Sequence, residues 1–291
     1  MGYVELRMYA EIYADALEFR KSTANKLRSG TVIDEGARLT DVNGLFTEVE
    51  HQMSLLMKRE LRKSVSPSVR AWQKSEPGIG EHLFARLIGA IGDPYVAQPY
   101  KWYGQGENRK LVAETPHVRT VAQLWSYCGH GDPERRMCKG ITATELAAMG
   151  NPRAKMLLHL LSEACVKAGV RVVEGTDPAD GERRAITRYG QVYLDARERY
   201  AARTHGSECK RCGPSGKPAL PGSPLSKGHQ HAAALRTVGK EILRDLWLAA
   251  REDALNESED LQDKFGGAIE FAKPKASAPR QKIDDDTAEA V

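Results

Sequence analysis

Residues 75–93 read SEPGIGEHLFARLIGAIGD, and this stretch carries the sharpest local signal in the chain. Apolar residues recur at helical spacing after Glu81, and Gly92-Asp93-Pro94 ends the pattern, so a helix is predicted between them. A helix that leads in from Trp72 would join it through Pro77-Gly78-Ile79-Gly80. The stretch therefore predicts two short helices with a tight turn, the arrangement of a helix-hairpin-helix.

The turn of this predicted helix-hairpin-helix is suited to contact with a phosphate group. Backbone N–H groups of Gly78, Ile79 and Gly80 could approach a phosphate closely, and the positive end of the helix dipole would add attraction. Lys74 and Arg86 could support the contact as point charges. The alternative is an ordinary glycine-containing connection between two helices.

Residues 1–70 predict a helical hairpin, because two runs of apolar residues repeat at helical spacing around a glycine-containing turn. The apolar positions are Tyr9, Ile12, Tyr13 and Ala16 in the first run, and Val42, Leu45, Phe46, Val49, Met53 and Leu56 in the second. Such a pair can simply pack on the rest of the protein. It can also form an antiparallel coiled-coil arm that pairs two copies of the chain.

The whole pattern predicts a mainly α fold in three parts. Residues 1–70 form the arm, residues 71–251 a helical domain that contains the helix-hairpin-helix, and residues 252–291 a disordered tail poor in aromatic residues. The segment 95–116, with aromatic residues among polar ones, is expected to be a loop.

Composition limits the function classes without choosing among them. The net charge is only +4, but acidic residues gather after position 252, so the part ahead of them is more basic than the total indicates. No stretch approaches the roughly 20 apolar residues that span a bilayer, so we expect no membrane partner and a cytoplasmic location. Five cysteines, an odd number, do not resemble a secreted disulfide framework.

Several short motifs occur in a shared order. They are Pro77-Gly78-Ile79-Gly80, Trp125-Ser126-Tyr127-Cys128-Gly129, Lys139-Gly140-Ile141, Gly150-Asn151-Pro152-Arg153 and the closing run from Lys240 to Trp247. In this order the motifs resemble the C-terminal transposase domain of the IS one-ten family of insertion-sequence transposases, over roughly residues 70–250. The resemblance implies a DNA-binding protein of transposition and recombination, with structured RNA as a further partner and a homodimer or higher oligomer as the acting form.

The basic residues near these motifs are the predicted nucleic-acid contacts. Arg135, Arg136 and Lys139 form a cluster suited to a phosphate backbone, and Arg153 follows the Gly-Asn motif. They join Lys74, Gly78, Ile79, Gly80 and Arg86 of the helix-hairpin-helix.

Two departures from the family place catalysis in doubt. The acidic residues of a RuvC-like nuclease half are not found in this chain, and the interval 131–140 lacks the serine nucleophile of the family. Cys138 is the one residue there that could attack as a thiolate, with its pKa lowered by basic neighbours. We therefore expect a truncated or catalytically degenerate relative, and the sequence leaves enzyme activity open.

Five potential metal ligands lie in a short span: His205, Cys209, Cys212, His229 and His231. A Cys-x-x-Cys pair aims two sulfurs at one point, and histidines farther along could complete a tetrahedral zinc site. Surface thiols and, less readily, redox chemistry are the alternatives.

Three functions fit these features. The first is a DNA-binding, transposase-like protein. The second is a recombinase subunit that acts with a separate nuclease chain. The third is a non-enzymatic, zinc-stabilised interaction module of a phage or mobile element, in which nucleic-acid contact is incidental.

Overall fold

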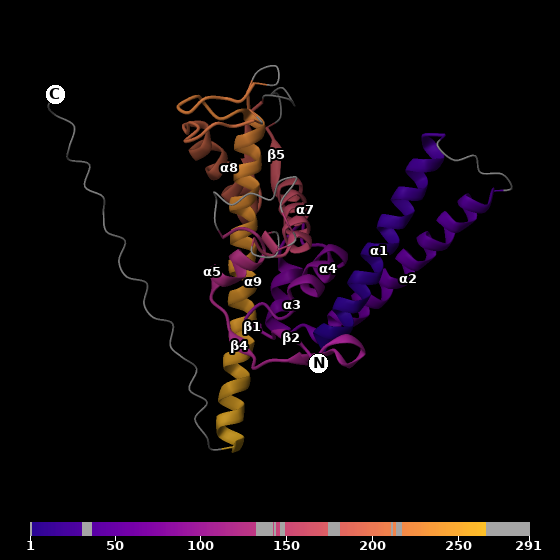
Figure 1. The fold of residues 1–291 in the computed structure, drawn as a ribbon. Helices are drawn as coiled ribbons and strands as arrows, with labels where there is room; N and C mark the ends of the chain where they lie inside the picture. The colour runs from indigo at the N-terminus through magenta and orange to yellow at the C-terminus, as the bar shows by residue number, and fades with distance from the viewer. Residues whose placement is uncertain are drawn as a thin grey trace.

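The computed structural model describes residues 2–30, 37–131, 142, 144–145, 149–173, 181–210, 212–213 and 217–265. This part of the chain is mainly helical, as predicted, with eight α-helices (Figure 1). They are α1 (Gly2–Arg28), α2 (Arg38–Ser64), α3 (Pro67–Ser75), α4 (Glu81–Ile91), α5 (Val121–Tyr127), α7 (Pro152–Gly169), α8 (Arg188–Ala201) and α9 (Lys227–Phe265).

The N-terminal hairpin is confirmed: α1 and α2 pack against each other along their length and project from the rest of the molecule as an arm (Figure 1). Phe19 and Phe46 stack across the pair with ring centroids 5.5 Å apart. Arg20 on α1 forms an ion pair with the mostly buried carboxylate of Glu50 on α2. These contacts join the outer part of the arm, while its inner part also packs on α4.

A long helix organises the body of the protein. α9 runs through it and contacts α3, α5, α7 and α8, with Val238, Ile242, Leu243 and Leu246 fully buried (Figure 1). Because apolar residues repeat on more than one side of this helix, several helices can pack around it. The core that results is continuous from the arm to α8.

Two close approaches between helices depend on glycine. A Cβ atom at Gly190, in the first turn of α8, would lie 2.1 Å from the carbonyl oxygen of Gly169 at the end of α7. A Cβ atom at Gly89 on α4 would lie 2.8 Å from the Cβ of Ala10 on α1. Larger side chains would push these helix pairs apart, so the glycines set the positions of α8 and of the arm.

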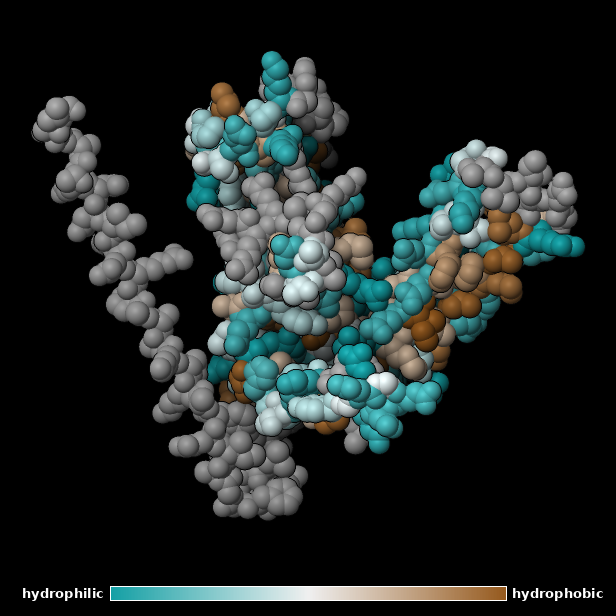
Figure 2. Space-filling view, viewed as in Figure 1, coloured by the Kyte–Doolittle hydropathy of each residue, from teal (hydrophilic) through white to brown (hydrophobic). Residues whose placement is uncertain are grey.

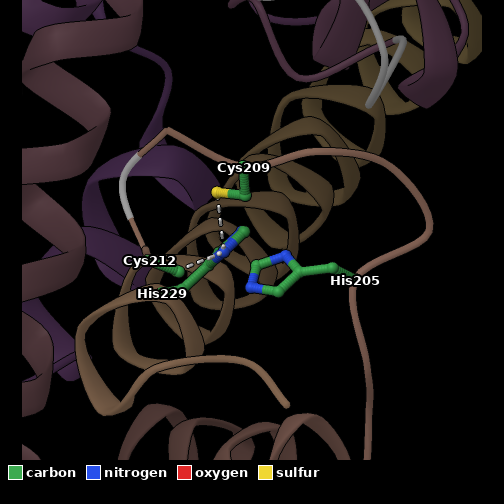
Figure 3. A group of neighbouring side chains, drawn as sticks. All are labelled: His205, Cys209, Cys212 and His229. Carbon is green, nitrogen blue, oxygen red and sulfur yellow. Dashed lines mark hydrogen bonds between the residues drawn. The ribbon is translucent and has the colours of Figure 1, made fainter. Parts of the chain in front are cut away.

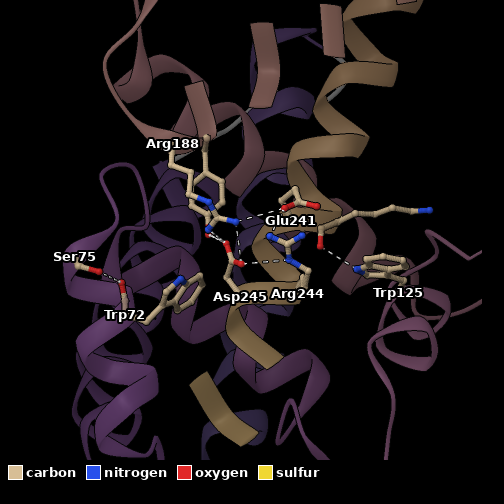
Figure 4. Close-up of polar contacts among 9 residues, drawn as sticks. Trp72, Ser75, Trp125, Arg188, Glu241, Arg244 and Asp245 are labelled. Atoms are coloured by element: carbon tan, nitrogen blue, oxygen red, sulfur yellow. Dashed lines mark hydrogen bonds and ion pairs between the residues drawn. The ribbon is translucent and has the colours of Figure 1, made fainter. Parts of the chain in front are cut away.

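A buried carboxylate fixes α8 against α9 (Figure 4). Asp245 on α9 accepts hydrogen bonds from the guanidinium of Arg188 and, at 2.9 Å, from the hydroxyl of Tyr189. Glu241 accepts a hydrogen bond from Arg188 at 3.5 Å and pairs with Arg244 at 2.7 Å. Burial raises the pKa of Tyr189, and the Asp245 charge raises it further, so the phenol stays protonated and donates.

The segment 95–116, expected to be a loop, contains short strands. Antiparallel pairs join β1 to β4, β2 to β3 and, elsewhere in the chain, β5 to β6. Their bounds are β1 Val96–Ala97, β2 Tyr100–Tyr103, β3 Lys110–Ala113, β4 His117–Val118, β5 Val170–Val172 and β6 Arg183–Ala185. Tyr100 and Val112 remain exposed on the β2–β3 ribbon, which explains why its sequence has no clear apolar pattern.

In the part of the chain that the structure describes, none of the helices is both long and apolar enough to cross a membrane. The segment predicted as a tail, 252–291, begins as helix, because α9 continues to Phe265. Residues 266–291 lie outside the described part.

Candidate metal centre and predicted nucleic-acid contacts

The loop between α8 and α9 is held by short-range backbone pairing. Cys209 and Ala219 exchange two N–H···O bonds of 2.9 Å, which close the middle of the loop. His205 is bonded in the same way to the far side, since its N–H donates to the carbonyl of Ser223 at 2.8 Å. His205 and Cys209 therefore lie on a segment that backbone hydrogen bonds hold to the returning half of the loop.

A tight turn brings the second cysteine beside the first. The N–H of Cys212 donates to the carbonyl of Cys209 at 3.3 Å, which is the turn that a Cys-x-x-Cys pair needs to aim both sulfurs at one point. Gly213 continues the turn, and a Cβ atom there would lie 1.4 Å from the carbonyl oxygen of Lys217. Only glycine fits at this position.

The fourth side chain comes from the first turns of α9. His229 places its Nδ1 3.3 Å from the sulfur of Cys212 and 3.8 Å from the sulfur of Cys209 (Figure 3). The His205 ring lies beside it, with ring centroids 5.2 Å apart. One ligand atom from each of the four residues lies within 4.8 Å of all the others.

The distances from the His229 Nδ1 to the two sulfurs fit a tetrahedral metal ion, whereas the widest separation in the group, up to 4.8 Å, would have to shorten by about 1 Å on binding. Zinc bonds of about 2.3 Å to sulfur and 2.0 Å to nitrogen put neighbouring ligand atoms roughly 3.3 to 3.8 Å apart. The Nε2 atom of His205 is buried and has no hydrogen-bond partner among the described residues, which is costly unless a ligand satisfies it. The group of His205, Cys209, Cys212 and His229, largely buried, could therefore bind a metal ion such as zinc.

The fifth predicted ligand, His231, lies apart from this group. Its Nδ1 is 2.7 Å from the hydroxyl of Tyr193 on α8. Residues two apart on a helix point to nearly opposite sides, so His229 and His231 cannot both face the loop. The structure thus brings together four of the five ligands predicted from sequence.

The predicted helix-hairpin-helix corresponds to α3 and α4, but its glycines have different surroundings. Gly78 has a φ of 94°, and a Cβ atom there would lie 2.6 Å from the Cα of Cys165 on α7. Ile79 is buried, whereas Gly80 has no atom within 4 Å of its Cβ position. Gly78 therefore permits close packing on α7, and Gly80 lies at the open side of the turn.

The open side of this turn carries mixed charges. Lys74 is exposed at the end of α3. Glu81, in the first turn of α4, accepts two hydrogen bonds of 2.7 and 2.9 Å from Arg62. That bond, with Lys58 and Lys74 nearby, lowers the pKa of Glu81, so an anionic carboxylate already occupies the positive end of the helix dipole.

Arg86 and Arg153 lie together at a cavity of about 370 Å³ between α1, α4 and α7. Burial lowers the pKa of the Arg86 guanidinium, which lies over the Tyr13 ring, and Arg153 lowers it further. Arg153 is 3.8 Å from Asp15 on α1. These arginines face the arm, so they are part of the contact between arm and body.

The remaining predicted residues, Arg135, Arg136, Cys138 and Lys139, lie outside the described part of the chain. Two other cysteines are described in the body, and both are buried. Burial raises the pKa of Cys128 and of Cys165 to about 12, so their thiols stay protonated and unreactive at neutral pH.

The clearest cationic surface is one that sequence reasoning missed. Lys155 and His159 lie one turn apart on α7, and Arg236 and Lys240 lie one turn apart on α9. All four act on the same buried imidazole, His130, and we call them the cationic band. Each pair has the four-residue spacing of a helix face, but only the packing of α7 on α9 joins the two faces.

The imidazole of His130 lies within electrostatic reach of all four residues. His130 is 8% exposed, and neither ring nitrogen has a hydrogen-bond partner among the described residues. Burial lowers its pKa, and the charges of Lys155, Lys240, Arg236 and His159 lower it further, to about 4. The imidazole is therefore neutral at physiological pH. Glu163 on α7 lies 3.5 Å from His159 and 3.8 Å from Lys167.

Lys240 also links the band to an aromatic ring. Its Nζ lies 5.0 Å from the ring centroid of Trp125, and the Trp125 indole N–H donates to the backbone carbonyl of Lys240 at 2.9 Å (Figure 4). The cation is thus held in place at the surface rather than free to swing away.

Comparison of the chain with protein-family models, with curated proteins and with solved structures found no match.

Proposed function

We propose that this protein binds duplex DNA through the cationic band of α7 and α9, as a transposase-like protein of a mobile element. The observation that carries the proposal is the gathering of Lys155, Arg236 and Lys240 around His130. Phosphate contacts supply most of the affinity of DNA-binding proteins, and lysine and arginine make them. The assignment to transposition draws on the motif order from Pro77 to Trp247.

The band continues toward the metal centre, which supports an extended contact. His231 lies near the N-terminal end of α9, and burial lowers its pKa. Arg197 lowers this pKa further, Glu163 raises it, and His159 and Arg183 lower it, so arginines from α8 and from the β5–β6 hairpin lie near this imidazole. Lys155, Arg236 and Lys240 near His130, with Arg197 and Arg183 near His231, would follow one stretch of a phosphate backbone.

In this proposal the metal is zinc and its role is structural. Two thiolates and two imidazoles are the donor set of closed structural zinc sites, which leave no position for a substrate. Zinc would fasten the α8–α9 loop to the first turns of α9 through His229. Because α9 carries half of the band, the metal would hold the DNA-binding face in its bound shape.

The test is charge reversal of the band in the full-length chain. The triple variant Lys155→Glu, Arg236→Glu, Lys240→Glu should bind a short labelled duplex much more weakly than the wild type. The logarithm of the association constant falls as the logarithm of the salt concentration rises, and the variant should make this slope shallower by about 3, one unit for each lost phosphate contact.

A matched control changes the same amount of charge elsewhere. The triple variant Lys21→Glu, Lys101→Glu, Lys110→Glu reverses three exposed lysines that lie on neither α7 nor α9. It should keep most of the affinity and slope, whereas equal losses in the two variants would mean that only net charge matters. Circular dichroism of both variants should match the wild type.

A further inference from the structure

The cavity of about 370 Å³ lies where α1 of the arm meets α4 and α7 of the body. The arm and the body diverge from this junction (Figure 1), and Figure 2 shows hydrophilic residues gathered there. Small residues leave the space open, since Ala10 and Ala14 on α1 and Gly89 and Ala90 on α4 all line it. The volume is in the range of small-molecule sites, so a small molecule rather than a duplex is the occupant that fits.

The charged residues of the cavity do not balance, because three arginines but only two carboxylates line it. Glu11 pairs with Arg7 at 3.0 Å, and Asp15 lies 3.8 Å from Arg153. For Arg86, the residues that the structure describes supply no carboxylate at ion-pair distance. The cavity therefore has one positive charge that this part of the protein leaves unmatched.

This unmatched charge is also partly withdrawn from water. The Arg86 guanidinium lies 4.9 Å from the centroid of the Tyr13 ring. Burial lowers the pKa of this guanidinium, Tyr13 raises it, and Arg153 lowers it again. The carboxylate of Glu50 raises the same pKa more weakly, but it already pairs with Arg20. Burying a charge without an opposite partner is costly, so an anion in the cavity would stabilise Arg86.

Arg153 provides a second guanidinium for the same anion. Its separation of 3.8 Å from Asp15 is longer than a hydrogen bond, so this ion pair leaves its N–H groups available to a ligand. Arg86 comes from α4 and Arg153 from the first turn of α7, and both line the cavity. A carboxylate is flat and has two oxygens, which suits the planar fork of a guanidinium.

The two acids limit the rest of the ligand. Glu11 and Asp15 are at least half exposed beside the arginines, and their charges repel an anion with two negative charges. Their oxygens accept hydrogen bonds, so they favour a ligand that also has hydroxyl groups to donate. A single negative charge on such a ligand matches the one unmatched arginine.

We propose that this cavity binds a small hydroxycarboxylic acid with one negative charge. The carboxylate of the ligand lies between Arg86 and Arg153, and its hydroxyl groups donate to Glu11 and Asp15. Because these residues come from both sides of the junction, the ligand fastens the arm to α4 and α7. The site is separate from the cationic band, since Arg153 and Lys155 are two residues apart on α7 and point to different sides.

The first experiment is isothermal titration calorimetry of the full-length chain, with glycerate and gluconate as the probes. At least one of them should bind saturably at one molecule per chain, whereas the uncharged polyol sorbitol should give no binding. Inorganic phosphate at equal ionic strength should bind at least tenfold more weakly than the better probe. No saturable binding of either acid would overturn the proposal, and so would equal or tighter binding of phosphate or sorbitol.

The second experiment locates the bound acid with single variants. Arg86→Gln and Arg153→Gln should each weaken binding at least tenfold, because each removes charge-assisted hydrogen bonds to the carboxylate. Arg59→Gln is the matched control, since Arg59 is exposed on α2 and does not line the cavity. The bound acid should raise the melting temperature of the wild type and of Arg59→Gln, and should leave that of the two cavity variants unchanged.

Arg153→Gln keeps the test decisive even where Arg86→Gln does not fold, because Arg153 is 40% exposed and its replacement leaves the helix packing intact. Wild-type affinity in the folded cavity variants would overturn the proposal. A loss of affinity in Arg59→Gln as large as in Arg153→Gln would overturn it too, because binding would then depend only on the net charge of the protein.

Discussion

Replacing Gly78 by alanine should destabilise the protein strongly, while the same change at Gly80 should not. Gly78 has a φ of 94°, a conformation that costs an L-residue about 1 to 2 kcal/mol. Its new methyl group would lie 2.6 Å from the Cα of Cys165 and 2.7 Å from the carbonyl oxygen of Ala164. Relieving overlap with backbone atoms typically costs a further 1 to 3 kcal/mol, so a loss of about 3 kcal/mol is expected.

Gly80 offers a matched comparison two residues away. Its φ is −69° and no atom lies within 4 Å of a Cβ there. Alanine would reduce the entropy of the unfolded chain but is a poorer residue at the start of a helix, and these effects nearly cancel. The free energy of unfolding should change by less than about 1 kcal/mol.

Urea denaturation followed by circular dichroism measures both variants. With an m-value of about 3 kcal/mol per molar, Gly78→Ala should lower the midpoint by about 1 M. DNA affinity of the folded Gly78→Ala protein should remain near the wild-type value, because Gly78 faces α7. Equal stability of the two variants, with DNA binding lost only in Gly78→Ala, would refute this reasoning and return the turn to the DNA interface.

Three further predictions follow from buried groups. Cys209→Ser should lose the bound zinc, which elemental analysis measures. Because metal binding contributes several kcal/mol to stability, this variant should also melt about 10 °C lower than the wild type. A zinc content equal to that of the wild type would exclude the site. His130 has a folded pKa of about 4 against about 6.5 when unfolded, so the unfolded state gains a proton first as pH falls. Stability should drop by up to about 3 kcal/mol from pH 6.5 to pH 4, and His130→Gln should remove this part of the pH dependence; an unchanged profile contradicts it. Asp245→Ala should cost about 2 kcal/mol in urea titrations, because the buried hydroxyl of Tyr189 loses its acceptor and the half-exposed guanidinium of Arg188 loses a solvent-screened partner. A loss below about 1 kcal/mol would mean that water replaces the carboxylate.

Local patterns in the sequence predicted the elements whose contacts are local. The α1–α2 hairpin follows from helical spacing on both sides of a turn, and the metal group follows from Cys209 and Cys212 with His229 one loop away. The exclusion of His231 was also within reach, because residues two apart on a helix face different ways. A helix that begins at residue 227 and contains both histidines is the signal that would exclude His231 from the ligand set.

Contacts between distant segments were beyond a single sequence. Gly78 packs against Cys165, 87 positions later, so the pattern of the turn could not show whether its glycine faces a phosphate or a helix. The cationic band needs α7 and α9 side by side, and neither pair of cations stands out on its own helix. The short strands between 96 and 118 lack apolar alternation, since much of their surface is exposed.

Lysine footprinting of the wild-type protein tests the DNA-binding face most directly. An amine-reactive reagent and mass spectrometry give the rate at which each lysine is modified, with and without a short duplex. We predict that duplex DNA slows modification of Lys155 and Lys240 severalfold and leaves Lys101 and Lys110 unchanged. Protection of Lys101 and Lys110 with Lys155 and Lys240 still reactive would contradict the assignment of the DNA-binding face to α7 and α9.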